Sequence, residues 1–89
     1  MKSKIRIGKN SKEWRLPNGE LHREDGPAME HNNGYKFWYI NDLLHREDGP
    51  AVVHPSGSKS WYLNNINYTE QEHKYEMRTI KLERLLNEK

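Results

Sequence analysis

The sequence predicts an α+β protein: an antiparallel meander of β-hairpin repeats followed by one C-terminal α-helix. The first indication is a duplication, because the segment LHREDGPA at residues 21–28 returns letter for letter at residues 44–51. Such a duplication in a chain of 89 residues indicates a repeat protein. The second indication is that a tryptophan opens each of three similar units, at Trp14, Trp38 and Trp61.

The third indication is the C-terminal region, which lacks glycine and proline and is rich in helix-forming residues. Thr69 and Glu72 form a capping-box pattern, so Thr69 is the expected N-cap. We therefore expect one domain over residues 1–89, with the repeat sheet at residues 4–68 and the helix at residues 69–88.

The composition indicates a thin core. Hydrophobic residues make up 33% of the chain and charged residues 31%, but three Trp and five Tyr supply large apolar surfaces. The absence of cysteine excludes disulfides and thiolate metal sites. No apolar run reaches the length of a signal peptide core or a membrane span, so we expect a soluble cytoplasmic protein without a membrane partner.

Charge is distributed unevenly along the chain. Residues 1–12 hold five Lys/Arg and no acid, whereas residues 13–69 hold five Lys/Arg against eight Asp/Glu. A basic arm of this kind is typical of nucleic-acid binding, but its lysines also protect an edge strand from unwanted pairing. The second interpretation is favoured, because the repeat body has the wrong sign for a track of phosphates.

The first unit reads as strands separated by turns. Residues 4–7 alternate charged and apolar side chains, as a half-buried strand does, and residues 13–16 form the returning strand. Asn18 and Gly19 predict a type I′ turn, with positive φ at both residues. Residues 20–23 are then the short partner strand.

The duplicated motif must interrupt the ladder, since proline lacks an N–H donor and glycine relaxes φ. We expect positive φ at Gly26 and Gly49. Strand structure resumes at residues 28–31, and the aromatic-rich residues 35–40 are expected to form one central strand covered on both faces. Further turns are expected at residues 32–34, 41–42, 55–57 and 64–65, with a last strand at residues 66–68.

Alignment of the units predicts the core. Nine equivalent apolar positions are expected on one face of the sheet: Trp14, Trp38, Trp61, Leu16, Ile40, Leu63, Leu21, Leu44 and Ile66. The opposite face carries Arg15, Tyr39 and Tyr62.

The helix has two apolar flanks, and packing on one sheet face needs only one. Met77, Ile80 and Leu85 are expected to pack on the sheet. The other flank, Tyr75, Leu82 and Leu86, is left for a target protein or for a second copy of the chain in a homodimer.

A unit of Trp-Tyr-x-Asn-Gly-x-Leu-His-Arg followed by a glycine-containing turn resembles the MORN family of β-hairpin repeats. The residues that carry the resemblance are Trp14, Asn18, Gly19, His22, Trp38, Asn41, His45, Trp61 and Asn64. Asp42 and Asn65 depart from it, because they replace the hairpin glycine. The phrase HREDGPA is similar to a MORN-like variant of bacteriophage and large-virus proteins, which implies a stacked, twisted sheet that acts as a scaffold.

The duplicated turns place an imidazole, a guanidinium and two carboxylates close together. Catalysis or a metal site, with His22 and His31 or His45 and His54 as joint ligands, is one interpretation. A structural role is favoured, because catalytic sites are seldom duplicated in one small sheet. In that role each Arg pairs with a nearby carboxylate and each His bonds a backbone carbonyl. The structural turn residues are His22, Arg23, Asp25, Gly26, His45, Arg46, Asp48 and Gly49.

These observations predict a small non-enzymatic protein-binding module without cofactor or metal. The resemblance implies a phage-encoded inhibitor that occludes the surface of a host or defence protein in the host cytoplasm. Candidate partner-binding residues are Tyr35, Phe37, Tyr39, Tyr62, Tyr75, Leu82 and Leu86. The alternative is a nucleotide or single-stranded nucleic-acid binding protein that stacks bases on the aromatic side chains; it is less favoured without a basic groove on the same face.

Overall fold

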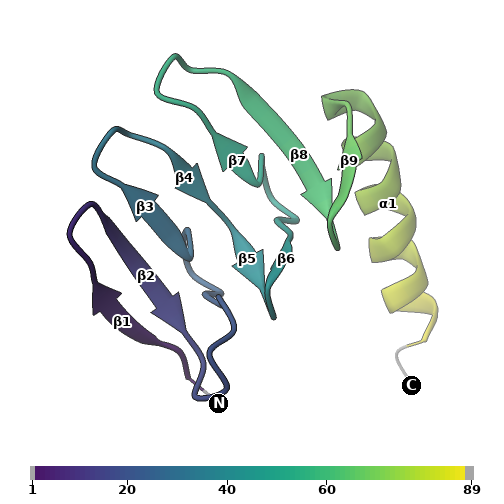
Figure 1. The fold of residues 1–89 in the computed structure, drawn as a ribbon. Coiled ribbons are helices and arrows are strands. Elements are labelled where there is room, and N and C mark those ends of the chain that lie inside the picture. The colour runs from purple at the N-terminus through teal and green to yellow at the C-terminus, as the bar shows by residue number, and fades with distance from the viewer. Residues whose placement is uncertain (1, 88–89) are drawn as a thin grey trace.

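A computed structural model, which describes residues 2–87, shows an α+β fold with a helix at the C-terminal end of a row of β-hairpins (Figure 1). Seven strands form one antiparallel sheet in the order β1-β2-β3-β4-β7-β8-β9, and β5 and β6 form a separate hairpin. The molecule is a thin slab, with principal extents of 45 × 33 × 17 Å. The strands are β1 Lys4–Ile7, β2 Ser11–Arg15, β3 Met29–His31, β4 Lys36–Phe37, β5 Tyr39–Ile40, β6 Leu43–Leu44, β7 Val52–Val53, β8 Lys59–Leu63 and β9 Ile66–Tyr68.

Two kinds of turn connect the strands. Three-residue loops end in Gly19, Gly34 and Gly57, whose φ angles are +92°, +101° and +96°. In each loop the glycine N–H donates to the carbonyl three residues earlier, as in a type I turn followed by a left-handed residue. The prediction of positive φ at Asn18 is therefore wrong, because Pro17 and Asn18 form a type I turn and only Gly19 is left-handed.

Two further turns are two-residue hairpins with positive φ at both central residues. Asn41 and Asp42 have φ of 48° and 68°, and Asn64 and Asn65 have φ of 50° and 69°. These values match a type I′ turn, for which asparagine and aspartate are suitable residues.

Residues 35–40 do not form one central strand. β4 pairs with β7, whereas β5 pairs with β6, and the HREDGPA turn is inserted between β6 and β7. The chain consequently changes partner at Trp38, whose N–H donates to the carbonyl of Ala51. In the first repeat the expected partner strand at residues 20–23 is reduced to a single bridge between Arg15 and Leu21.

Asp42 and Asn65 join each repeat to the one before it. The Asp42 carboxylate accepts the Leu21 N–H at 2.8 Å, and the Asp42 N–H donates to the Leu21 carbonyl at 2.8 Å. Asn65 makes the same two bonds with Leu44, at 2.7 and 2.8 Å. Glycine at these positions would leave the Leu N–H without this acceptor. Gly19 occupies the position in the first unit, which no other repeat precedes.

The core is smaller than the nine-residue stripe expected from the sequence. Of those positions only Leu21 and Leu63 are buried; the tryptophans are half-buried, and Ile66 in the edge strand β9 is 58% exposed. The nine positions also do not share one face as expected, because Leu21 pairs with Arg15 and Leu44 pairs with Tyr39, opposite the tryptophans. A slab of this thickness has no second layer to cover either face. The remaining buried hydrophobic residues in the described part of the chain are Ala28, Ala51, Val52 and Met77.

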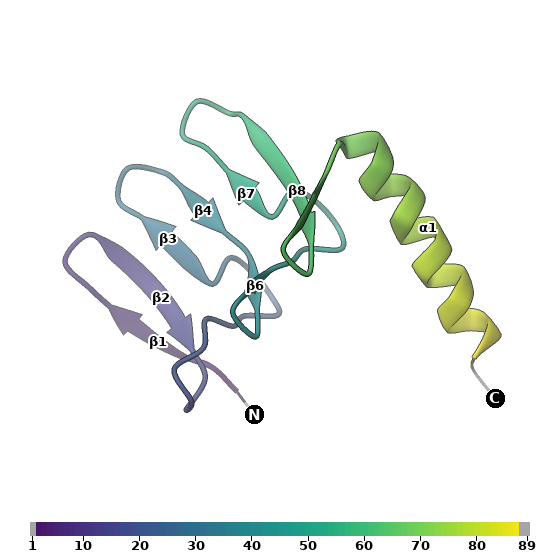
Figure 2. The same cartoon turned by 45° about the vertical axis from the view of Figure 1, so that its right-hand side comes forward.

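Helix α1 spans Glu70–Leu86 and begins with the expected capping box of Thr69 and Glu72. Residue 88, where the prediction ended the helix, lies outside the described residues. The helix stands beside the last hairpin, and its C-terminal half leads away from the strands (Figure 2). In this region Leu85 is 65% exposed, so its expected packing on the sheet is wrong. Within residues 2–87 no helix is long and apolar enough to span a membrane.

His73 and Met77 are the two helix residues that are buried. The His73 Nε2–H donates to the carbonyl of Arg46 over 2.7 Å, so the helix is bonded to the second duplicated turn. The residues flanking the helix interface also include Pro50 and Trp61. The helix therefore occupies the place next to Trp61 where a third HREDGPA turn would lie.

We expect His73→Ala to destabilise the protein by about 2–4 kcal/mol, because it leaves a cavity and removes the hydrogen bond that the imidazole donates to the Arg46 carbonyl. Helical circular dichroism should then be lost at lower denaturant than tryptophan fluorescence. Lys74→Ala, at the exposed neighbouring position, is the control. Coincident, unshifted transitions in both variants would show that His73 does not hold the helix.

Candidate functional site

The strand register sorts the side chains onto two faces, since directly paired residues of antiparallel strands lie on the same face. The turn face carries Trp14, Trp38 and Trp61 together with the two HREDG turns. The aromatic face, on the other side, carries Tyr35, Phe37, Tyr39 and Tyr62.

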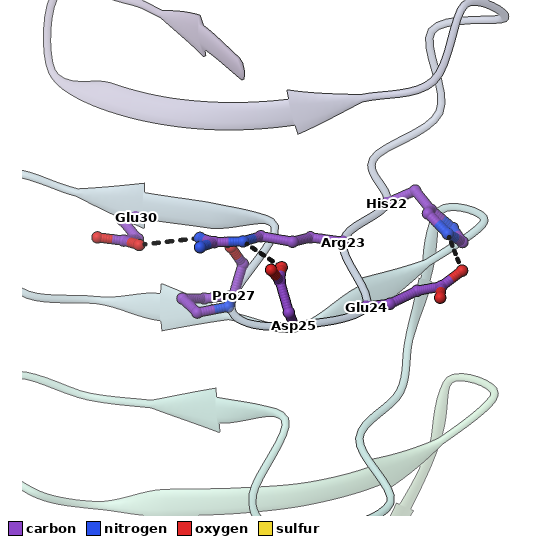
Figure 3. Close-up of polar contacts among 6 residues, drawn as sticks. All are labelled: His22, Arg23, Glu24, Asp25, Pro27 and Glu30. Atoms are coloured by element: carbon purple, nitrogen blue, oxygen red, sulfur yellow. Dashed lines mark hydrogen bonds and ion pairs between the residues drawn. The ribbon is translucent and has the colours of Figure 1, made fainter. Parts of the chain in front are cut away.

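On the turn face, the arginine of each HREDG turn holds the turn together. The Arg23 guanidinium donates to the Asp25 carboxylate at 3.0 Å and to the Pro27 carbonyl at 3.1 Å, and it lies 3.5 Å from Glu30 (Figure 3). The expected pairing of the arginine with a carboxylate of its own turn is thus present. Its Cζ also lies 3.9 Å from the centroid of the Trp14 ring, a cation–π contact.

The second turn repeats this geometry. Arg46 donates to Asp48 at 3.0 Å and to the Pro50 carbonyl at 3.1 Å, and its Cζ is 4.0 Å from the Trp38 ring centroid. The two copies of the motif therefore have the same contacts as well as the same amino-acid sequence.

The histidines connect each repeat to the next one, although not through a carbonyl as expected. The Asn41 N–H donates to His22 Nδ1 at 3.0 Å, and the His22 Nε2–H donates to Glu24 at 3.2 Å (Figure 3). His45 has the same arrangement with Asn64 and Glu47. Because Nδ1 accepts a hydrogen bond, the geometry corresponds to the neutral ring with its proton on Nε2.

The prediction of positive φ at Gly26 and Gly49 is wrong, because neither residue has a left-handed backbone. Space explains the glycines instead. A Cβ on Gly26 would lie 2.9 Å from Arg23 Cζ, and one on Gly49 would lie 2.9 Å from Arg46 Cζ. Each glycine leaves room for the guanidinium that stacks on tryptophan.

The histidine pairs considered as metal ligands do not come together. His31 and His54 lie on the aromatic face, against Phe37 and Tyr35 at ring distances of 5.8 and 5.0 Å. His22 instead contacts Glu24 and Asn41. Among the described residues no group of His, Asp and Glu is arranged to hold a metal ion.

A groove of about 810 Å³ lies between the two turns, open to solvent. Trp38 and Ile40 lie in it, and the turn carboxylates border it. In the described part of the chain, every buried side-chain polar atom has a hydrogen-bond partner. The acidic side chains at the groove are therefore ones that already accept hydrogen bonds from the Arg and His side chains of their own turns.

Arg84 distinguishes the second turn from the first. Its two terminal nitrogens donate to the Glu47 carboxylate at 3.0 and 2.7 Å, which joins the end of the helix to the turn. The hydrogen bond from Arg84, with a smaller one from His45, lowers the pKa of Glu47 below its ordinary value despite partial burial. The corresponding Glu24 side chain is 80% exposed. Arg84 and His73 were not predicted as functional residues, because a basic residue and an imidazole on a helix do not by themselves indicate contacts with a distant turn.

The aromatic face holds a line of rings. Tyr35 and Phe37 are stacked, with centroids 5.8 Å apart and planes inclined by 7°, and Tyr39 follows at 6.4 Å from Phe37. Burial, with a contribution from the Asp42 charge, raises the pKa of Tyr39. These rings and Tyr62 are half-buried. The helix lies beside Pro50 and Trp61 on the turn face, so it leaves this line of rings open.

The candidate partner-binding residues thus belong to two surfaces. Four lie on the aromatic face. The other three, Tyr75, Leu82 and Leu86, form the outer flank of α1, where their exposed fractions are 67%, 57% and 69%. At 100° per residue, these three side chains point away from Met77, which faces the sheet.

Fold and surfaces together define a class: a row of β-hairpin repeats, joined by Asx-type bonds and closed at one end by a helix. In comparisons with known proteins, no family model matches the chain, and no curated protein or solved structure matches it.

We expect Gly49→Ala to destabilise the protein by about 1 kcal/mol, because the new Cβ displaces the Arg46 guanidinium from Trp38. In an Arg46→Ala background the same change should instead be neutral or stabilising by up to about 1 kcal/mol, since alanine restricts the unfolded chain. Denaturant midpoints of the four proteins in this cycle test the expectation.

Gly57→Ala provides the control for backbone strain. Gly57 has φ of +96° and nothing near its Cβ position, so its substitution should destabilise equally with or without Arg46. A cost at Gly49 that persists after Arg46 is removed would contradict the spatial explanation.

Arg84→Gln should raise the pKa of Glu47 toward its ordinary value. A lowered folded-state pKa stabilises the fold above the unfolded-state pKa, and this stability is lost as the pH falls through the folded-state pKa. The stability difference between parent and variant should therefore be largest at neutral pH and disappear in strong acid. Carboxyl NMR titration of Glu47 in the parent and the variant measures the shift directly.

Proposed function

We propose that this chain is a small, non-enzymatic protein-binding module that acts by occluding a surface of its target. The observation that carries the proposal is the outer flank of α1. Large apolar side chains rarely remain exposed side by side unless they meet a partner. Tyr75, Leu82 and Leu86 follow one another at a spacing of seven and then four residues, the pattern with which a helix enters an apolar groove.

The helix is also a firm support for this flank. His73 bonds the Arg46 carbonyl, Met77 is buried, and Arg84 pairs with Glu47, so the inner side is attached at three positions, the last through an exposed ion pair. A segment that is ordered before binding loses less conformational entropy when the complex forms. This arrangement favours tight occlusion by a small surface.

A non-enzymatic role is supported by the contacts of the duplicated turns. Their histidines, arginines and acids bond one another and the backbone, and the set occurs twice with matching distances. These contacts account for the chemically suggestive residues as scaffold. The MORN-like resemblance adds the biological part of the proposal, a bacteriophage-encoded inhibitor of a host or defence protein, acting in the host cytoplasm.

We expect Leu82→Glu/Leu86→Glu to weaken target binding at least about tenfold, because buried apolar anchors dominate such interfaces. The double variant adds two negative charges on the exposed flank. Arg78→Ala/Lys81→Ala lowers the net charge by the same amount on another side of the helix and should bind normally. Binding is measured with a purified target obtained by capture on the parent protein.

Sedimentation of the same variants addresses the homodimer. A parent dimer that dissociates in Leu82→Glu/Leu86→Glu would assign the flank to self-association instead. Monomers in all proteins, with target binding intact in the double variant, would remove the helix from the interface.

A further inference from the structure

We propose that the aromatic face is a second binding surface and that it takes single-stranded nucleic acid, with bases on the rings and phosphates on cations at the N-terminal edge. This inference is independent of the protein-binding flank, which lies on the outer side of α1.

Strand register places basic side chains on the same face as the rings. Lys4 pairs with Arg15, and Arg6 pairs with Glu13. Glu13 in turn pairs with Met29, and Met29 with Phe37. Paired residues share a face, so Lys4, Arg6 and Arg15 lie on the aromatic face. Neighbouring strands are about 4.8 Å apart, which puts the basic edge within about 15 Å of the Phe37 strand.

The charge of this face is opposite to that of the repeat body as a whole. In its paired strand positions, three basic residues stand against Glu13 alone, which Arg15 contacts at 2.8 Å. Lys4 and Arg6 are exposed. The acids of the duplicated motif lie on the turn face, together with Glu30 of β3: Glu24, Asp25, Glu47 and Asp48. Five of the eight acids of residues 13–69 therefore lie away from the rings, and Asp42 is the one whose charge acts on a ring, that of Tyr39.

The rings form a surface on which bases can stack. Tyr35 and Phe37 have nearly parallel planes, and Tyr39 continues the line toward the motif end of the sheet. His31 and His54 flank it, with ring nitrogens that can bond phosphates or base edges. Aromatic side chains in an open sheet beside cations are the combination that binds single strands without strong sequence preference.

Charge complementarity selects the occupant. An aromatic face alone suits a protein partner equally well, but phosphates are repeated negative charges and match an edge where cations are in excess. A duplex hides its bases, so it engages the cations and leaves the rings unused. Single-stranded nucleic acid uses both.

The test is fluorescence anisotropy of labelled oligothymidine and oligouridine with the full chain over a range of salt concentrations. We expect binding that weakens with salt and exceeds binding of a duplex of equal length. Lys4→Ala/Arg6→Ala should reduce the salt slope by about 1.4, at about 0.7 for each lost phosphate contact. Lys36→Ala, which removes a charge from the opposite face of β4, should leave it unchanged.

Phe37→Leu retains an apolar side chain in the sheet while removing the ring, and it should weaken oligonucleotide binding by about tenfold at an unchanged salt slope. Thermal melting of each variant checks that the fold persists. Leu82→Glu/Leu86→Glu should bind the oligonucleotide normally, so the two proposals can fail separately.

Four outcomes would overturn the proposal: no oligonucleotide binding at low salt, equal weakening by Lys36→Ala, preference for the duplex, or stronger binding to vesicles of anionic lipid. Loss of protein-target binding in Phe37→Leu, without any oligonucleotide binding, would assign the face to protein.

Discussion

A single-layer sheet has no second layer to cover its tryptophans, and the structure depends on the arginines that cover them instead. Arg23 and Arg46 lie over the rings of Trp14 and Trp38, with Cζ at 3.9 and 4.0 Å from the ring centroids. A guanidinium can cover an aromatic ring and remain bonded at its edges, which a lysine cannot do as well. Those edge bonds require nearby acceptors, and the turn supplies them.

The rest of the motif follows from this requirement. Asp25 accepts from Arg23 Nε, the carbonyl of Pro27 accepts from a terminal nitrogen, and Gly26 leaves the space that the guanidinium fills. Ala28 then re-enters the sheet, fully buried, and bonds the strands on both sides. One physical task, covering a ring without a second layer, explains why the arginine, aspartate, glycine, proline and alanine of HREDGPA occur together, whereas the histidine and glutamate join one repeat to the next.

After the last copy of the motif, another element must cover the exposed tryptophan. Trp61 has no third arginine turn, and the helix lies beside it, with His73 bonded to the Arg46 carbonyl. Repeat sheets need such an end because the last unit would otherwise expose its face. The helix is therefore a part of the repeat architecture, and its outer flank is the surface that this role leaves free.

Local chemistry was predictable from the sequence, whereas relations between repeats were not. The capping box of Thr69, the strand at residues 4–7 and the turn at residues 41–42 depend on neighbours in the chain, although that strand is exposed and not half-buried as expected. The bonds from Asp42 and Asn65 to the preceding repeat depend on how repeats stack, so from the sequence these residues are only departures from the hairpin glycine of the motif. The glycines of the turn were assigned to backbone strain, because an arginine folding back over its own turn leaves no mark in the sequence.

The candidate binding surfaces, too, were predictable only where they depend on local sequence. Exposure of Tyr75, Leu82 and Leu86 follows from helix periodicity, a local property. The residues that lie beside Tyr35 and Phe37 on the sheet cannot be predicted in this way, because they depend on the register between strands. Counting charge along the chain put the acidic repeats and the aromatics together, and the register separates them.

This separation of charge has a structural cause. Each arginine over a tryptophan needs carboxylates within reach, so the acids of the motif are confined to the turn face with it. On the aromatic face Glu13 pairs with Arg15, whereas Lys4 and Arg6 of the edge strand remain exposed. Because few acids lie on the aromatic face, the positive charges of Lys4 and Arg6 in the edge strand are not neutralised there. The basic character of the aromatic face is thus a consequence of how the opposite face covers its tryptophans, and a partner rich in phosphate would exploit a charge pattern that packing had already produced.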